Sequence, residues 1–547
     1  MTPPDGSTVS STGPVSALTE VPTVVDHIIV GAGVAGCVLA ARLSENPELS
    51  VLLIESGDDP AQGPPELQNA IATPGLAPTL WADHRVANLD ITVPQAALEN
   101  RRVPLTTGRG LGGGSTINAM AWSHGFPADY DSWASHGAVG WGWDVIGPLL
   151  RGAENHELGP SEHHGGSGPV SVSTPRHLHP ASAAFVQSGV RAGIELSHDL
   201  NGEHREGIGH LPVTMRDGAR HSAVDAYLRP ALSRPNLHVL TQEQVRRVVI
   251  EGGRAVGVLT GEGHEWRARR DVVLCAGTLR TPQLLMLSGI GPADHLTAHG
   301  IEVLHHSPSV GMNLHDHPVV SIAWALVDTV AARGGRYDDA SEVYRLLHRG
   351  PLAAIGQTVA VTRSSARVDQ PDLHLIFAPL GEDAGGPPLP VPMVACHLAL
   401  LAPHSRGSVR LASADPTDSP LIDPAYLTEP ADRARLHDGL RRMQEVFDEA
   451  PLSSLTGQRL GLDRDADTSS IDAYINENLA TYWHPVGTAR MGDDEDAVVD
   501  PTLAVRGVRD LIVADASVMP HIPAAALQAP TTAIAERAAQ ILARSLQ

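Results

Sequence analysis

The sequence contains no lysine, so all 39 of its basic residues are arginines, and with 62 acidic residues the formal net charge is −23 at pH 7. A chain without lysine lacks the amine used in Schiff-base catalysis and the phosphate-binding lysine of a P-loop. Its negative charge also argues against nucleic acid and anionic membrane surfaces as partners. We therefore expect neither Schiff-base chemistry nor a P-loop, and no nucleic-acid partner.

Cysteines are scarce. The chain has three, Cys37, Cys275 and Cys396, and their scattered positions give no pairing pattern. Such usage is typical of a reduced, cytoplasmic protein. Residues 1–23 are polar and lack the basic start and apolar segment of a signal peptide, and no apolar stretch is long enough to span a membrane. We expect a cytoplasmic protein with a disordered leader over residues 1–23 and no membrane span.

Metal-binding and serine-hydrolase motifs are also missing. None of the 28 histidines joins a cysteine or carboxylate cluster with the spacing of a zinc site, and there is no His-Glu-x-x-His motif. No Gly-x-Ser-x-Gly turn follows an expected strand, which excludes the nucleophile elbow of a serine hydrolase. The sequence therefore predicts no metal site and no serine nucleophile.

The most informative segment lies near the N-terminus. The β-branched residues of 24–30 predict a buried strand, a glycine-rich turn over 31–36 follows at once, and a helix over Cys37–Leu43 comes next. A second expected strand, Val51–Ile54, ends at Glu55, about 20 residues past the last glycine of the turn, as in the dinucleotide-binding fingerprint. This order of strand, turn, helix and acid predicts a Rossmann-type nucleotide site.

Each residue of the fingerprint has its own physical role. Gly31 permits the tight turn, Gly33 lets the backbone approach a pyrophosphate, and Gly36 lets the helix pack closely on the strand. The helix N-terminus stabilises phosphate charge through its free N–H groups. The Glu55 carboxylate is placed to accept hydrogen bonds from a ribose diol and would repel a 2′-phosphate. NAD and FAD both satisfy this pattern.

A second glycine-rich stretch, Thr107–Asn118, contains five glycines and runs into an apolar segment. It predicts a loop that lies flat against a ligand before a helix begins. Residues 56–78 are rich in glycine and proline and are expected to be irregular, with Trp81 following them. Another helix is expected near Val145–Arg151.

These stretches resemble the glucose–methanol–choline (GMC) oxidoreductase family, flavoproteins that oxidise alcohols with FAD. Four later stretches resemble further family signatures and occur in the family's order: Ala276–Gly291, Val310–Pro318, His484–Gly492 and Val513–Pro520. The resemblance spans nearly the whole chain, and it implies FAD rather than NAD as the cofactor.

The resemblance implies an α/β fold (α+β overall), in which a Rossmann-type FAD-binding domain carries an inserted antiparallel-sheet substrate-binding domain. On this basis residues 24–151, 205–300 and 479–547 are assigned to the FAD-binding domain, and residues 152–204 and 301–478 to the substrate-binding domain.

Sequence patterns add six further strands, of which the first three are expected to form a meander that feeds the fourth. They cover residues 236–241, 246–251, 255–260, 271–275, 372–377 and 397–401.

The resemblance places the chemistry at His484. In the family, the histidine of this motif faces the flavin ring and holds the substrate oxygen, and an imidazole titrates in the range required of a general base. The position where some relatives attach FAD covalently through histidine is Ile117 here, so non-covalent FAD is expected. The expected FAD contacts are Gly31, Gly33, Gly36, Glu55, Trp81, Gly113, Ser115, Asn118, Val245, Trp483, Asp515 and Ala516.

One position departs from the family pattern. Where the family has a second histidine or asparagine, this chain has Ala526, whose methyl group cannot hydrogen-bond the substrate oxygen. His521 and Gln528 are candidate catalytic replacements because they lie close in sequence. Alternatively, the substrate supplies its own polar group, or the reaction is not ordinary alcohol oxidation.

We therefore expect FAD-dependent oxidation of a hydroxyl group on a small organic substrate, with His484 as the general base and oxygen or another molecule as the electron acceptor. A lyase or decarboxylase of the same fold, and a catalytically silent FAD-binding protein, remain as alternatives.

Overall fold

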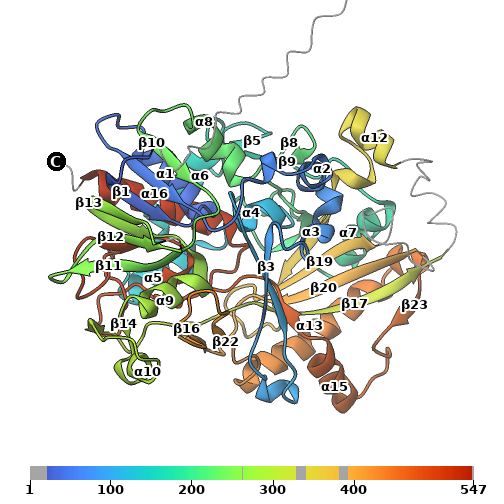
Figure 1. Ribbon diagram of the computed structural model, residues 1–547. Helices are drawn as coiled ribbons and strands as arrows, with labels where there is room; N and C mark the ends of the chain where they lie inside the picture. Colours follow the sequence, from blue (N-terminus) through green and yellow to red (C-terminus); the bar gives the residue numbers. More distant parts are fainter. Residues whose placement is uncertain (1–20, 262, 328–339, 381–391, 545–547) are drawn as a thin grey trace, which may run out of the picture.

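The computed structural model describes residues 21–261, 263–327, 340–380 and 392–544, and most of the expected leader lies outside this part of the chain. The described residues form two large sheets, each with its own helices, that lie side by side (Figure 1). The first sheet is mainly parallel and the second is antiparallel. This architecture confirms the predicted α/β (α+β overall) fold.

The first sheet contains the predicted fingerprint. Its helix α1 (Val34–Leu43) connects two neighbouring strands that run parallel to each other, as in a right-handed crossover unit. Five strands are mutually parallel and lie in the order β10 (Leu237–Leu240), β2 (Val51–Ile54), β1 (Val24–Val30), β13 (Glu265–Leu274) and β25 (Leu511–Val513). The chain therefore brings its N-terminal and C-terminal parts into one sheet.

An antiparallel meander extends this sheet. β11 (Val245–Glu251) pairs with β12 (Arg254–Thr260), which pairs with the first residues of β13. The prediction of a meander is correct for these three strands. It is wrong for β10, which pairs in parallel with β2 instead. A run of β-branched residues identifies a strand but not its neighbours, because long-range backbone pairing decides them.

Helices α1, α6 (Trp143–Ala153) and α16 (Gln528–Arg544) pack together beside the first sheet (Figure 1). The Arg42 guanidinium on α1 donates to the Glu536 carboxylate on α16 at 2.9 Å, and the hydroxyl of Tyr227 donates to the same carboxylate at 2.8 Å. These contacts tie the C-terminal helix to the helix of the fingerprint.

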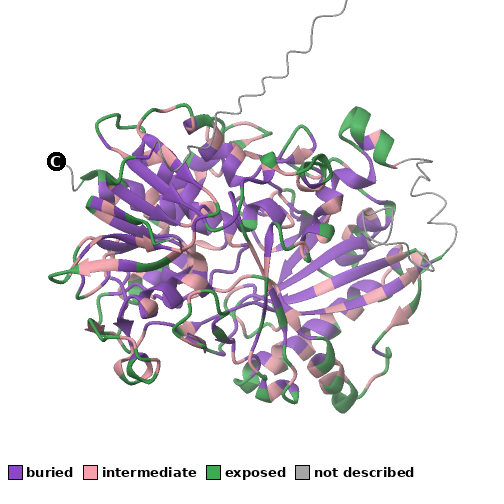
Figure 2. Ribbon diagram, in the orientation of Figure 1, coloured by how far each residue is buried: buried purple, intermediate pink, exposed green. Residues whose placement is uncertain are grey.

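The second sheet is antiparallel and has two different faces. One face packs against helices α13 (Pro430–Asp448) and α7 (Pro180–Arg191), and most residues of its strands are buried (Figure 2). The other face lines a cavity. The strand order is β23 (Thr456–Leu460), β17 (Pro318–Leu326), β20 (Met393–Leu400), β19 (Leu373–Leu380), β18 (Thr358–Thr362) and β7 (Gly207–His210), with β24 (Ala480–Thr481) also paired to β17.

Two segments of the chain differ from what the sequence predicts. β7 lies within residues 205–300, which were assigned to the FAD-binding domain, but its backbone pairs with β18 of the second sheet. Residues 56–78, expected to be irregular, contain the helix α2 (Pro65–Ala72). This helix begins at a proline, whose fixed φ angle suits the first helical position.

Shorter elements connect these layers in the described part of the chain. The other α-helices are α3 (Ala77–Leu80), α4 (Gly114–Ile117), α5 (Pro127–Ser135), α8 (Arg229–Ala231), α9 (Gly277–Leu287), α10 (Ala293–Ala298), α12 (Ala340–Leu347), α14 (Leu452–Leu455) and α15 (Thr468–Asn478). The other strands are β3 (Ala87–Ile91), β4 (Pro104–Gly108), β5 (Glu154–His156), β6 (Val170–Val172), β8 (Met215–Arg216), β9 (Ala219–Arg220), β14 (Ile290–Gly291), β15 (His305–His306), β16 (Met312–Leu314), β21 (Gly407–Arg410) and β22 (Leu421–Asp423). No helix among the described residues is both long and apolar enough to cross a membrane.

Candidate active site

A cavity of about 1120 Å³ lies between the two sheets. Its walls come from the glycine turn after β1, the second glycine loop at 107–118, the motif loop around His484 and the uncovered face of the second sheet. Concave sites lined mainly by apolar groups and a few polar ones are typical of cofactor and substrate binding.

The glycine turn leaves room for a ligand at the N-terminus of α1. A Cβ atom on Gly31 would lie 2.5 Å from the carbonyl oxygen of Cys275, and one on Gly36 would lie 1.9 Å from the carbonyl oxygen of Gly31. A Cβ on Gly33, in contrast, would meet no protein atom within 4 Å. Gly33 also caps α1 without a side-chain hydrogen bond. The free N–H groups and the open space beside them fit a phosphate group.

Glu55 faces the same part of the cavity and also joins three loops. Its Oε1 atom accepts hydrogen bonds from the backbone N–H groups of Gly57 (2.8 Å) and Gly110 (3.2 Å). Its Oε2 atom accepts one from the N–H of Ala32 (2.8 Å). The carboxylate therefore organises both glycine loops in addition to lining the cavity.

Most of the residues expected to hold FAD line this cavity. They are Gly31, Gly33, Glu55, Trp81, Gly113, Ser115, Asn118, Val245, Trp483, Asp515 and Ala516. Gly36 does not line it, because it lies beneath the turn against the backbone of Gly31.

The three residues expected to be catalytic are placed differently. His484 and Gln528 line the cavity, as does Ala526, the position that departs from the family pattern. His521 does not line it. The ring of His521 lies 5.0 Å from the ring of His136, on the side of the segment that faces α5.

Gln528 is oriented by a chain of hydrogen bonds. The Nη1 atom of Arg220 donates to Oδ1 of Asn118 at 2.8 Å, and Nδ2 of Asn118 donates to Oε1 of Gln528 at 2.7 Å. Because its oxygen already accepts this bond, Gln528 has its Nε2 donor left for a ligand.

His484 takes part in a second chain of hydrogen bonds. The Nδ1 atoms of His484 and His317 lie 3.0 Å apart, and Nε2 of His317 lies 3.0 Å from the carbonyl oxygen of Leu401. A carbonyl oxygen only accepts, so a neutral His317 carries its proton on Nε2 and accepts at Nδ1. A neutral His484 then donates from Nδ1, which leaves its Nε2 without a proton.

Both rings are neutral. Burial lowers the pKa of His317 well below its usual range. Burial, together with the nearby His374, lowers the pKa of His484 to about 3. The two hydrogen bonds therefore select one tautomer of His484, in which Nε2 is the free base.

The loop that carries His484 is held by Asp316. The Asp316 carboxylate accepts hydrogen bonds from the backbone N–H of His484 at 2.9 Å and from the hydroxyls of Thr481 and Tyr426 at 2.5 Å each. Burial raises the pKa of this carboxyl group to about 6. The carboxylate thus fixes the backbone at the base, whereas His317 fixes its ring.

No role could be assigned to Asp316 or His317 from the sequence. Both belong to the His-Asp-His-Pro part of the stretch Val310–Pro318, which was the only signal available. Their contacts join residues 167 and 168 positions apart, and such contacts are not visible before the chain is folded.

Two tryptophans form an edge of the cavity. The ring centroids of Trp81 and Trp483 lie 5.2 Å apart, and the two indole planes are tilted by 37°. The indole N–H of Trp81 donates to the carbonyl oxygen of Ile117 at 2.9 Å. Trp483 is 43% exposed, so this edge reaches the protein surface.

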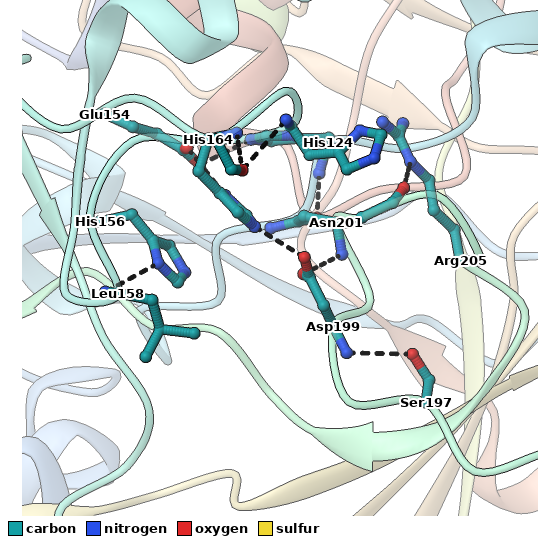
Figure 3. A network of polar contacts seen from close by, with 12 residues as sticks. His124, Glu154, His156, Leu158, His164, Ser197, Asp199, Asn201 and Arg205 are labelled. Atoms are coloured by element: carbon teal, nitrogen blue, oxygen red, sulfur yellow. Dashed lines mark hydrogen bonds and ion pairs between the residues drawn. The ribbon is translucent and has the colours of Figure 1, made fainter.

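A second network of histidines lies elsewhere in the molecule (Figure 3). The buried Glu154 carboxylate accepts hydrogen bonds from Trp122 (2.6 Å) and His124 (2.7 Å) through Oε1, and from His164 (3.1 Å) through Oε2. The other ring nitrogen of His164 lies 2.8 Å from a carboxylate oxygen of Asp199. Burial alone would lower the pKa of His164, but its bonds to Asp199 and Glu154 raise it to about 9.

Comparison with known proteins identifies the family. The N-terminal GMC oxidoreductase family model matches residues 25–319, and the C-terminal one matches residues 403–535. With its nucleotide cavity and histidine loop the fold is that of a flavin-dependent oxidoreductase, and the chain belongs to the GMC oxidoreductase family.

Relatives of known sequence and structure cover nearly the whole chain. Alcohol dehydrogenase [acceptor] of Pseudomonas putida is 38% identical over 542 residues, covering 95% of this chain and 96% of that protein. Mitochondrial choline dehydrogenase of Homo sapiens is 37% identical over 531 residues, covering 94% and 89%. The crystal structure of pyridoxine 4-oxidase from Mesorbium loti superposes with a TM-score of 0.84 at 32% identity, covering 94% and 98%. A formate oxidase of Aspergillus oryzae, studied for its FAD modification, gives a TM-score of 0.86 at 28% identity, covering 95% and 98%.

These findings confirm the family, the FAD cofactor and the enzyme class predicted from the sequence. The chain is a GMC-type oxidoreductase with FAD as its cofactor, and its relatives include enzymes named as dehydrogenases of alcohols and of choline.

Proposed function

We propose that this enzyme oxidises a primary or secondary hydroxyl group on a small organic molecule, and that His484 accepts the hydroxyl proton at Nε2. FAD in the cavity supplies the hydride acceptor. Removal of hydride from the carbon leaves a protonated carbonyl unless the hydroxyl proton departs as well. A base within hydrogen-bond reach of the hydroxyl therefore lowers the barrier.

The observation that carries this proposal is the direction of the hydrogen bonds through His317. The chain from His484 to His317 to the Leu401 carbonyl oxygen leaves Nε2 of His484 as a proton acceptor on the cavity side. Because burial lowers the pKa of His484 to about 3, the ring is unprotonated at neutral pH. After Nε2 takes the proton, the Nδ1–H group of the imidazolium still has His317 as its acceptor.

Gln528 is the second polar contact in this proposal. Its Nε2 donor is left free by the bond from Asn118, and it lines the cavity two residues from Ala526. An amide donor beside the reacting oxygen stabilises the negative charge that develops when the proton leaves. Gln528 thus supplies the hydrogen bond to the substrate oxygen that the methyl group of Ala526 cannot make.

The proposal also covers the way FAD is held, the domain boundaries and the cellular location of the enzyme. FAD is held non-covalently, since Ile117 offers no nucleophile, and oxygen or another acceptor reoxidises it. The FAD-binding domain comprises residues 24–151, 205–300 and 479–547, with β7 and β24 given instead to the substrate-binding domain because both pair with strands of its sheet. The three cysteines are buried and unpaired, which supports a reducing, cytoplasmic location.

The test is anaerobic mixing of the purified protein with primary and secondary alcohols while flavin absorbance is followed. We expect loss of the oxidised flavin spectrum with at least one class of alcohol. Acid denaturation should release free FAD into the supernatant. A flavin that no hydroxyl compound reduces would contradict the proposed reaction, and flavin that stays with the precipitate would contradict non-covalent binding.

A further inference from the structure

Among the described residues of the second sheet that line the cavity, one polar pair stands in an otherwise apolar wall. Ser321 on β17 and His397 on β20 stand directly opposite each other in the antiparallel register, and Ser321 Oγ lies 2.7 Å from His397 Nδ1. Both residues line the cavity. The sheet residues that line it around them are apolar: Val319, Ile376, Ala378, Pro379 and Met393.

Packing alone does not require this pair. On the opposite face of the same two strands, the directly paired residues are Ile322 and Cys396, and both are fully buried in the apolar core. A buried polar group costs free energy unless it is hydrogen-bonded, so an aliphatic pair would have filled the same place without that cost. The hydroxyl and the imidazole therefore point to a ligand.

One hydrogen-bonding atom of the pair is left for that ligand. His397 bonds Ser321 through Nδ1, and its Nε2 atom has no side-chain or backbone partner among the described residues. Burial lowers the pKa of His397 to about 4, so the ring is neutral. Nε2 can therefore donate or accept one hydrogen bond, with the proton position set by the Ser321 hydroxyl.

The part of the cavity wall that the second sheet forms around the pair carries no charge. The described sheet residues that line the cavity include no aspartate, glutamate or arginine. The carboxylates that line it elsewhere have other partners. Glu55 accepts from the N–H of Ala32 and Asp515 from the N–H of Gly277. Asp418 accepts from the hydroxyl of Ser413, and Glu243 lies 3.8 Å from His264. A cationic group beside the pair would lack a counter-charge, and an anionic group would lose its hydration without compensation.

We propose that the Ser321–His397 pair is a subsite for the far end of the substrate, an inference that rests on oxidation at His484. The substrate class is an uncharged alcohol with an apolar body and a second uncharged polar group several atoms from the oxidised hydroxyl. A hydroxyl, carbonyl or ring nitrogen satisfies the pair. A quaternary ammonium alcohol does not.

The test compares matched substrates in matched variants. kcat/KM is measured for straight-chain mono-alcohols, for α,ω-diols of the same lengths, and for choline as the cationic probe. The variants are Ser321→Ala and His397→Leu. Thr358→Val is the control, because it removes a buried hydroxyl from the opposite face of the same sheet. Flavin content and melting temperature establish that each variant is folded.

We expect the unmodified enzyme to prefer the diol of one particular length over its mono-alcohol by about tenfold, beyond the statistical gain from a second hydroxyl. Ser321→Ala and His397→Leu should lose that preference while oxidising mono-alcohols as before, and Thr358→Val should keep it. Should His397→Leu fail to fold, Ser321→Ala alone decides.

Equal diol preference in the unmodified enzyme and Ser321→Ala would overturn the subsite, and so would more efficient oxidation of choline than of any diol. Failure of the proposed reaction would give a different result from failure of the subsite, because no alcohol would then reduce the flavin at all.

Discussion

The two histidine networks of this protein place similar buried rings in opposite charge states. At His484 the ring partner is another neutral imidazole, and burial lowers the pKa of His484 to about 3. At His164 burial acts in the same direction, but the partners are the carboxylates of Glu154 and Asp199, and the pKa rises to about 9. Hydrogen-bonding partners, rather than burial alone, decide which ring is a base and which is a cation.

The different charge states of His484 and His164 correspond to different roles, one in the reaction and one in the stability of the fold. A neutral ring that faces a cavity can accept a proton, whereas a charged ring between two carboxylates has both nitrogens occupied and no free lone pair. The His164 network joins β5 to the loop that carries Asp199 (Figure 3). We therefore expect changes at His484 to affect turnover and changes at His164 to affect folding.

The largest expected effect is that of His484→Ala on flavin reduction. Removal of a general base typically slows proton transfer by about 10²–10⁴-fold, and we expect a loss of that size in the anaerobic reduction rate. FAD should remain bound, since the glycine loops are untouched. Rapid mixing with monitoring of flavin absorbance measures the rate. His198→Ala, at an exposed histidine, is the control, and an unchanged rate in His484→Ala would remove the proposed base.

Glu154→Gln should break the second network. The substitution leaves the His164 imidazolium with one carboxylate and removes the charged acceptor of Trp122 and His124. Loss of one partner of a buried ion pair typically costs about 3–5 kcal/mol of unfolding free energy. Urea denaturation measures this cost. The exposed Glu162→Gln is its matched control, and a similar midpoint for both variants would show that the network does not stabilise the fold.

His317→Leu should slow the reaction without removing the base. The Nδ1–H group of His484 would lose its acceptor, so the tautomer with a free Nε2 would no longer be selected. A hydrogen bond to a group that becomes charged is worth about 1.5–3 kcal/mol, so its loss should slow the reaction by about 10–100-fold. His317→Gln should recover much of the rate, because its amide can accept from His484 and donate to the Leu401 carbonyl oxygen. Equal rates for the Leu and Gln variants would contradict a role in fixing the tautomer.

The smallest expected effects concern pH: the melting temperature should depend on pH through His164, and the rate of flavin reduction should not depend on it through His484. The folded-state pKa of His164 lies above its ordinary value of 6.5, so its contribution to stability is complete below about pH 6.5 and is lost as the pH rises through about 9. Melting temperature should therefore fall more steeply over that range in the unmodified protein than in His164→Gln. The rate of flavin reduction should show no acid limb from His484 between about pH 5 and 7, since its pKa is lowered to about 3. Parallel stability profiles for the two proteins would contradict a charged His164.

Local signals explain which parts of the fold could be predicted. β1, α1 and β2 follow from a β-branched run, a glycine turn and a closing acid, all within some thirty residues, and β2 has the expected bounds. The partners of β7 and β10 could not be predicted, because pairing joins them to strands far away in the chain. Sequence alone could not show that Gln528 lines the cavity and His521 does not, because both lie within a few residues of Ala526.

The neighbouring indoles of Trp81 and Trp483 also allow the state of the cavity to be followed by tryptophan fluorescence. Indole emission overlaps the absorption of an oxidised flavin, so cofactor in a cavity lined by both rings quenches their fluorescence by energy transfer. Release of FAD should brighten the protein, and reduction of FAD should change the signal again as the overlap falls. Cofactor occupancy and redox state can thus be followed in real time without a label, at the edge through which the cavity meets solvent.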